Sequence, residues 1–413
     1  MFLFLVGLVV PWLIYLGPLR MSAYRLVLCI TILPCLGMWV AGKAGRMRAA
    51  DVAVVLLPAW CALGLVRIHG MHLAVETSGI IFLESVGPYL LARCYVRDAD
   101  DFHKVVQVLF GMVALLTPFA IVEFATGHNV SRELFAMILP TRTEAMPPRF
   151  GLTRVQSVFD HPILFGLFAG SLLSLVYLVL GHQRDVLQRS LKSAVVAGAS
   201  LMSLSSGPLI GLGIQAFFLS WNGMFSANKS RWKVLAALLL SMYVVIELAA
   251  NRSVLQIVGG HLLDAGSYWY RTWIFDYGIR SVASHPLYGV GMGEWERPAW
   301  MGDSIDNFWL YEAVRHGVPA VLLLLLACVS IVSSLGFKKG LDAKVTEYRT
   351  AFLMTLMAFC LVGGTVHFWG AAYVLFLFLM GSGVWMLDVT EAGEQRSKQA
   401  QTASRHVRRA SVP

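Results

Sequence analysis

The sequence predicts an all-α, polytopic membrane protein with about 12 transmembrane helices and two long loops. Hydrophobic residues make up 57% of the chain and charged residues only 14%, whereas soluble domains carry roughly 25% charged residues. Apolar runs of about twenty residues, the length that crosses a bilayer as a helix, recur from end to end. Lysine and arginine gather in alternate connections between these runs, which is typical of a multi-pass protein.

The apolar runs predict one transmembrane domain over residues 1–388. A polar, basic tail at 389–413 is expected to be disordered. The start of the chain lacks a basic region and a small-residue cleavage site, so we expect a first membrane helix there and not a removed signal peptide. The expected spans are about 2–18, 26–42, 50–67, 78–93, 105–126, 161–181, 193–205, 207–222, 233–250, 315–336, 348–366 and 369–388.

The distribution of positive charge predicts the orientation of the chain. Alternate short connections are rich in lysine and arginine, the tail joins them, and the other short connections carry few such residues. Because positive loops stay on the cytoplasmic side, both termini are expected in the cytoplasm. The two long loops, about 127–160 and 251–314, are then expected to face outward.

Two other classes of protein and site are disfavoured. The net charge of +9 lies in short loops and in the tail, without a basic patch interleaved with aromatic residues, so we expect no nucleic-acid partner. None of the six cysteines forms a C-x-x-C pair, which disfavours a zinc site or a disulfide framework. No histidine spacing typical of a metal site occurs, and no metal or cofactor is expected.

Residues 266–317 form the longest polar interruption in the second half of the chain. Trp269, Trp273 and Tyr277 recur every four residues, which predicts a helix with an aromatic face that lies flat at the membrane interface. On this helix Asp276 and Arg280 are four positions apart and are expected to pair with each other. The other arginine, Arg271, has no acidic residue three or four positions away, so it is our first candidate to bind a substrate anion.

A His-Pro pair at 285–286 ends this predicted helix, and glycines follow at 289, 291 and 293. No strand precedes the glycines, so a dinucleotide-binding motif is excluded, whereas a glycine turn that binds an anion through its N–H groups stays open. Asp306 and Asn307 then precede a span. Asp306 is either a carboxylate base with Asn307 orienting it or the substrate, or an N-cap; Asp303 could also be the cap. Arg315 is a further candidate for substrate binding beside this pair.

The first long loop supplies two more arginines, Arg149 and Arg154. An arginine near the outer interface can extend to lipid headgroups or can grip a phosphate with two parallel hydrogen bonds. Asp160 is expected to cap the following helix, with Pro162 in its first turn.

Several acidic residues within or beside the spans have two interpretations. Glu84, Glu123 and Glu247 fall in the outer half of the membrane, where a carboxylate either serves function or pairs with an arginine to hold helices together. Asp98 and Asp100 form a D-x-D triplet on the cytoplasmic side. It resembles a metal and nucleotide-sugar motif, but capping of the next helix by Asp100 or its neighbour Asp101 is the simpler explanation.

Taken together, these motifs resemble the O-antigen ligase and polymerase superfamily of bacterial inner membranes. The resemblance covers the whole chain in topology and rests on five stretches of sequence. They are Arg271-x-Trp273, the His-Pro-Leu-x-Gly-x-Gly-x-Gly run at 285–293, the x-Asn-x-x-Leu box at 306–310 before Gly317, and R-x-x-S-V-F-D-H-P-x-x-x-G at 154–166 with the Ser-Ser-Gly-Pro turn at 205–208.

The resemblance implies a glycosyltransferase that takes glycan from an undecaprenyl-pyrophosphate carrier at the periplasmic face of the inner membrane, without metal or nucleotide. Arg271 and Arg154 would bind the pyrophosphate of the donor, and the acceptor would be a glycan or a lipid-linked saccharide. Membrane lipid and a chain-length regulator protein are the other implied partners. Relatives usually carry His-Asn at 306–307, and often an arginine at 206–207. The aspartate at 306 favours a polymerase of exopolysaccharide or O-antigen repeat units, with an O-antigen ligase and a transporter without bond chemistry as alternatives.

Overall fold

The computed structural model describes residues 1–17, 19–142, 146–249 and 265–389. It is about 70% helical and contains almost no strand, as the sequence predicts. Its one small sheet in this part of the chain is an antiparallel pair, β1 (Ile14–Leu16) and β2 (Leu19–Met21). Most of the tail predicted to be disordered lies outside the described residues.

Six helical segments are long and apolar enough to cross a membrane. They are α2 (Ala23–Val40), α3 (Ala49–His69), α5 (Ala99–Thr126), the continuous α7–α8–η1 (Pro162–Gly170, Leu173–Leu175, Val176–Leu180), α15 (Val318–Phe337) and α16 (Ala343–Val362). Other helices lie on further predicted spans. They are α4 (Met71–Tyr95), α9 (Val186–Leu201), α10 (Ser206–Met224), α11 (Arg231–Ala249) and the shorter apolar α17 (Ala371–Ser382) with η2 (Val384–Leu387).

The first predicted span, 2–18, is not a single helix. Helix α1 covers only Phe2–Gly7, and the chain then turns into the β1–β2 hairpin. Pro11 cannot sit in a helix interior without removing a hydrogen bond, and Gly17 adopts a left-handed conformation (φ +62°) that suits the turn. Local breakers therefore outweigh the apolar composition of this segment.

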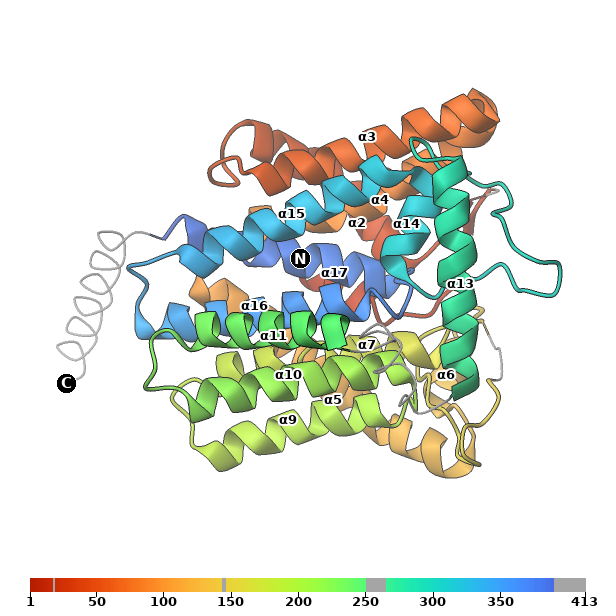
Figure 1. Cartoon of the computed structure of the whole chain (residues 1–413). Coiled ribbons are helices and arrows are strands. Elements are labelled where there is room, and N and C mark those ends of the chain that lie inside the picture. Colours follow the sequence, from red (N-terminus) through yellow and green to blue (C-terminus); the bar gives the residue numbers. More distant parts are fainter. Residues whose placement is uncertain (18, 143–145, 250–264, 390–413) are drawn as a thin grey trace, which may run out of the picture.

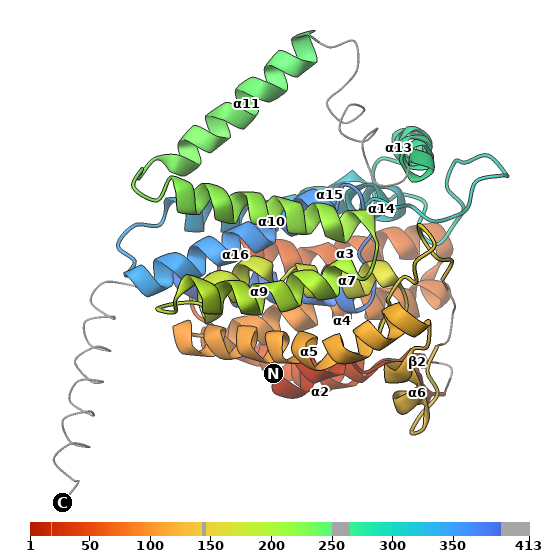
Figure 2. The same cartoon turned by 90° about the horizontal axis from the view of Figure 1, so that it is seen from below.

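The bundle is organised around α17 and α4. Every residue of α17 except Tyr373 is buried, and the helix packs against α4, α7 and α16. Helix α4 also packs against α2 and α3, and α15 lies on α3 (Figure 1). On the other side of α17, α10 contacts α7, α9 and α16 (Figure 2).

The two ends of the bundle are different. One end carries α6 (Val130–Ala136), the β1–β2 hairpin, α13 (Ala265–Ser284) and α14 (Phe308–His316), which belong mostly to the two long loops (Figures 1 and 2). Helix α13 runs across the ends of the bundle helices and not along them. Trp269 and Trp273 on α13 are 59% and 44% exposed, and this geometry suits the flat, interfacial helix that the aromatic spacing predicts.

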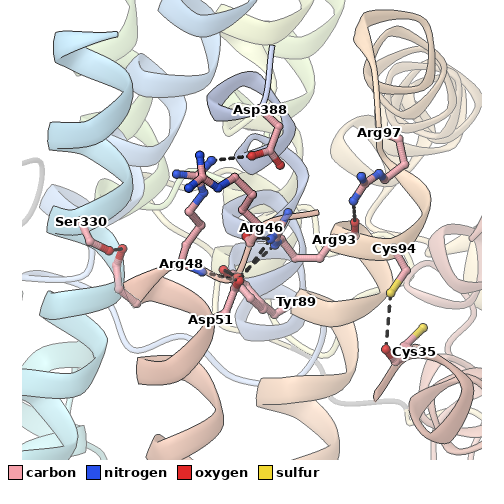
Figure 3. Close-up of polar contacts among 11 residues, drawn as sticks. Cys35, Arg46, Arg48, Asp51, Tyr89, Arg93, Cys94, Arg97, Ser330 and Asp388 are labelled. Carbon is pink, nitrogen blue, oxygen red and sulfur yellow. Dashed lines mark hydrogen bonds and ion pairs between the residues drawn. The ribbon is translucent and has the colours of Figure 1, made fainter. Parts of the chain in front are cut away.

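The opposite end of the bundle is held by a buried ion pair. Arg93 of α4 and Asp51 of α3 are joined at 2.9 Å, and their side chains are 1% and 0% exposed. Tyr89 also donates to Asp51, and Arg48 pairs with Asp388 just beyond η2 (Figure 3). Because removing one partner would leave a buried charge uncompensated, this network holds α3, α4 and the end of the described chain together.

Candidate functional site

Three arginines from the two long loops converge on the connection 204–206, between α9 and α10. Arg149 donates to the backbone carbonyl of Leu204 (3.0 Å), and Arg154 donates to the hydroxyl of Ser205 (3.0 Å). Arg271 of α13 donates to the hydroxyl of Ser206 (3.5 Å). The positive charges predicted separately on the two loops therefore meet at one place, which favours binding of an anion.

Arg154 points into the protein. Its partner Ser205 is only 1% exposed. Burial, together with the charge of nearby Arg149, lowers the pKa of Arg154 to about 10. A guanidinium that is buried beside a like charge gains by acquiring a negative ligand, because an opposite charge favours its charged form.

Asp306 supplies a carboxylate to this arginine cluster. Its Oδ2 lies 4.0 Å from Nε of Arg271, and its side chain is 38% exposed. The hydroxyl of Ser304 donates to the other carboxylate oxygen at 2.9 Å. Asp306 is thus oriented by one hydrogen bond and one charge, and it stays accessible to a ligand.

The helix cap next to Asp306 is Asn307, so neither Asp306 nor Asp303 has the capping role. Oδ1 of Asn307 accepts the N–H of Leu310 at 3.0 Å, in the first turn of α14. Its Nδ2 donates to the carbonyl of Gly364 at 2.9 Å, which ties the start of α14 to the connection between α16 and α17. Asn307 therefore positions the backbone beside Asp306.

Arg315 contacts the glycine turn at 289–293 and not the 204–206 connection. Nη1 of Arg315 donates to the carbonyls of Gly291 (3.2 Å) and Gly293 (2.6 Å). The N–H groups of Gly289, Gly291 and Gly293 all donate to carbonyls of the protein. The turn accordingly has no spare glycine N–H for an anion, and it serves to hold the second loop against α14.

His161 is a neighbour of the site that the sequence reasoning did not select. It, and not Asp160, caps α7: its Nδ1 accepts the N–H of Ile163 at 3.1 Å. Asp160 instead pairs with Arg132 at 3.6 Å. Burial, reinforced by the charge of Arg154, lowers the pKa of His161 to about 4, so the ring is neutral at physiological pH. The signal in the sequence was the histidine immediately before the helix proline.

The carboxylates predicted within the spans have structural partners where the structure describes them. Glu84 pairs with Arg25 at 2.8 Å and accepts a hydrogen bond from Tyr24 at 2.7 Å. Glu123 accepts two backbone N–H groups of the first long loop, at 3.0 and 2.9 Å. The side chain of Glu247 lies outside the described residues. Glu84 and Glu123 thus connect elements of the fold.

The D-x-D triplet is explained by helix capping, although the cap is Asp98 and not Asp100 or Asp101. Its carboxylate accepts the N–H groups of both later aspartates, at 2.9 and 2.8 Å. Asp100 pairs with Lys344 at 2.7 Å. In the part of the chain that the structure describes, no group of three or more His, Cys, Asp or Glu residues is arranged to hold a metal ion.

The predicted pair between Asp276 and Arg280 is wrong. Both residues lie in the described part of α13, and no ion pair joins them there; the guanidinium of Arg280 lies 5.1 Å from the ring centroid of Tyr277 instead. Cation–π attraction and access to water hold Arg280 on the outer face of the helix. Arg271, nine positions earlier, faces the site, as its place on the opposite side of the helix predicts.

No protein-family model matches this chain, and a search of curated proteins finds no match.

Proposed function

We propose that this protein is a glycosyltransferase that polymerises oligosaccharide repeat units linked to undecaprenyl pyrophosphate. The reaction would take place at the periplasmic face of the bacterial inner membrane and yield exopolysaccharide or O-antigen. One observation carries the proposal: arginines from both long loops meet at 204–206 with the accessible carboxylate of Asp306 beside them. Guanidinium groups match the geometry of phosphate oxygens, and a neighbouring carboxylate can accept a proton.

The division of roles follows from charge. Arg154 and Arg271 bind the pyrophosphate of the donor, and Arg149 adds positive charge behind them. Asp306 takes the proton from the acceptor hydroxyl while that oxygen forms its bond to the anomeric carbon. The bond between this carbon and the pyrophosphate oxygen breaks, and the carrier leaves as undecaprenyl pyrophosphate. Positioning and charge stabilisation suffice for such a leaving group.

The orientation belongs to the same proposal. The connections richest in lysine and arginine lie at the end of the bundle opposite to the arginine cluster (Figure 1). Positive loops remain in the cytoplasm, so the cluster is proposed to face the periplasm. In this orientation the arginine cluster would lie at the level of the pyrophosphate headgroup of the carrier, at the periplasmic surface of the membrane.

The test is complementation of a strain that lacks the gene with variants of the full-length protein. Arg271→Ala and Asp306→Ala are expected to lower polymer synthesis by about 100-fold or more, since each removes a group that acts in the transition state. Arg280→Ala is the matched control: it removes an arginine from the outer face of the same helix and is expected to leave synthesis unchanged. Polysaccharide gels of whole-cell extracts measure the product.

The gel separates the possible functions. Accumulated single repeat units in the two site variants support a polymerase. Free polymer together with uncapped lipid A core would make the protein a ligase instead. Polymer of normal amount and length in both site variants would reject the proposed site.

A further inference from the structure

A large cavity lies beside the arginine cluster. Its volume is about 650 Å³, and it is enclosed by α2, α3 and α4 on one side and by α14 and the segment 367–371 on the other. Sites for small molecules have volumes of about 300–1,000 Å³ and combine apolar walls with a few polar groups. None of the three arginines that contact the connection 204–206 lines this cavity. The cavity is therefore a second site with its own chemistry.

The inner wall of the cavity carries polar groups that have no charge at neutral pH. Glu312 of α14 is only 8% exposed and makes no hydrogen bond or ion pair with the described part of the protein. Burial raises the pKa of Glu312 to about 8. His316, one helical turn later, and His367 also line the wall, and burial lowers their pKa values to about 4 and 3. Nδ1 of His367 is buried without a hydrogen-bond partner.

Aromatic rings stand among these polar groups. Tyr311 lies 3.8 Å from His367, measured between ring centroids, and Trp369 stacks on the same histidine at 5.8 Å. Both rings line the cavity, as do Trp12 and Tyr373. A ligand that has flat apolar faces edged by hydroxyl groups complements such a wall, because rings cover its faces and neutral polar groups bond its edges. A sugar ring has this chemistry.

The charges of the cavity are either paired inside or placed at its rim. Arg25 is neutralised by Glu84 at 2.8 Å, and Arg315 is engaged by the carbonyls of the glycine turn. Arg20 lines the cavity and is exposed, which puts it at the opening. The interior therefore suits an uncharged saccharide, and the rim suits a phosphate attached to it.

The cavity adjoins the proposed reaction centre through two elements. Helix α14 begins beside Asp306 and reaches Glu312 five residues after its cap, about 8 Å along the axis. Trp369 in the cavity wall also lies 5.8 Å from the ring of His161, next to the arginine cluster. A saccharide held against Glu312 would therefore lie about 8 Å along α14 from the helix cap beside Asp306.

We propose that this cavity binds the sugar rings of the acceptor glycan, and that the carboxylic acid of Glu312 donates a hydrogen bond to a sugar hydroxyl. The identification of the bound glycan as the acceptor rests on the proposed function, whereas the binding of saccharide by the cavity does not. Glu312 is a positioning residue here and takes no part in bond formation.

The experiment measures sugar binding directly. Purified full-length protein in lipid nanodiscs is titrated with the methyl glycosides of glucose, galactose, mannose and N-acetylglucosamine, and saturation-transfer NMR reports binding. At least one glycoside is expected to bind the wild-type protein. Glu312→Leu should weaken this binding about tenfold, as expected for loss of a buried hydrogen bond, whereas Glu312→Gln, whose amide still donates, should retain it.

Two further variants guard against a folding artefact. Thr77→Trp narrows the cavity from α4, where Thr77 is half-buried, and should weaken binding while the fold is kept. Glu296→Gln changes a carboxylate that does not line the cavity and should have no effect. Each variant is checked by its elution as a monodisperse particle and by its melting temperature.

The outcomes separate this inference from the proposed function. Binding that persists in Arg271→Ala and Asp306→Ala proteins supports a separate saccharide site even if no polymer chemistry is found. Absence of binding by any glycoside, or equal binding by wild type, Glu312→Leu and Thr77→Trp, overturns the cavity proposal and leaves the arginine site untouched. Loss of binding in Glu312→Gln equal to that in Glu312→Leu overturns the donor role.

Discussion

At the scale of single residues, neighbouring side chains at the start of α14 have different tasks. Asn307 uses both ends of its amide for the backbone, at Leu310 and Gly364. The carboxylate of Asp306 bonds only the Ser304 hydroxyl and faces Arg271 at 4.0 Å among the contacts resolved for it. Capping is thus assigned to the asparagine, and the aspartate is available for chemistry.

This division predicts opposite effects of two substitutions. Asn307→Ala should lower the free energy of unfolding by about 1 kcal/mol, the usual cost of a lost N-cap. Asp306→Ala should change stability by less than about 0.5 kcal/mol, because its partly exposed ion pair contributes little, while polymer synthesis is lost. Denaturant unfolding in detergent measures the first effect and the polysaccharide gel measures the second.

Asp303→Ala is the control for this comparison, since Asp303 is exposed and contributes its backbone carbonyl to the contact with Trp295. It should leave both stability and synthesis unchanged. If Asp306→Ala destabilised the protein as much as Asn307→Ala, the aspartate would be a structural residue and not a base.

At the scale of elements, a single predicted span divides into two helices. The apolar pattern placed one helix at 315–336, whereas α14 ends at His316 and α15 begins at Val318, with Gly317 between them. Gly317 has φ +82°, and a Cβ there would lie 2.0 Å from the carbonyl oxygen of Leu287. This close approach fixes α14 against the glycine turn, so it also fixes Asp306.

Gly317→Ala is therefore expected to destabilise the protein by more than about 2 kcal/mol, from left-handed backbone strain together with the clash. Gly213→Ala in α10 is the matched control, because a Cβ there meets nothing within 4 Å. Its effect should stay within about 1 kcal/mol, since alanine favours a helix. Thermal unfolding of the purified proteins measures both, and an unchanged melting temperature for Gly317→Ala would contradict the packing described.

At the scale of the whole molecule, polar function is separated along the bundle axis. The loops that carry the arginine cluster lie at one end of the bundle (Figure 1). The Asp51–Arg93 ion pair lies at the opposite end (Figure 3). Such polarity has a functional use only if each end meets a different compartment.

Cysteine labelling tests this arrangement. In a background with the six native cysteines replaced by serine, Trp300→Cys should react with an impermeant maleimide added to intact spheroplasts. Lys339→Cys, at the opposite end of the bundle, should react only after the membrane is opened. Both native side chains are exposed, so access is governed by topology. Labelling of both positions from the same side would contradict the orientation.

The sequence alone determined the features that depend on near neighbours. Apolar runs of helical length led to the helical membrane bundle, and the spacing of aromatic residues led to the surface helix α13. Arg271 is a candidate because no acidic residue lies three or four positions away, and Arg149 and Arg154 because arginines near the outer interface can grip a phosphate. Asp306 is a candidate because it is a carboxylate beside Asn307 just before a predicted span. These signals are local, since helix formation and membrane insertion depend on residues within a few turns.

The tertiary structure alone decided which of these residues meet. Arg154 and Arg271 are 117 positions apart, and only the packing of α10 against α7 and α9 supplies the connection 204–206 that gathers them. Arg315 is an equally good candidate in the sequence, but in the structure it donates a hydrogen bond to the glycine turn. Glu312 gave no signal at all, because burial in a cavity depends on helices from distant parts of the chain. Long-range contacts are selected by packing and by pairing of buried polar groups, and no local pattern encodes them.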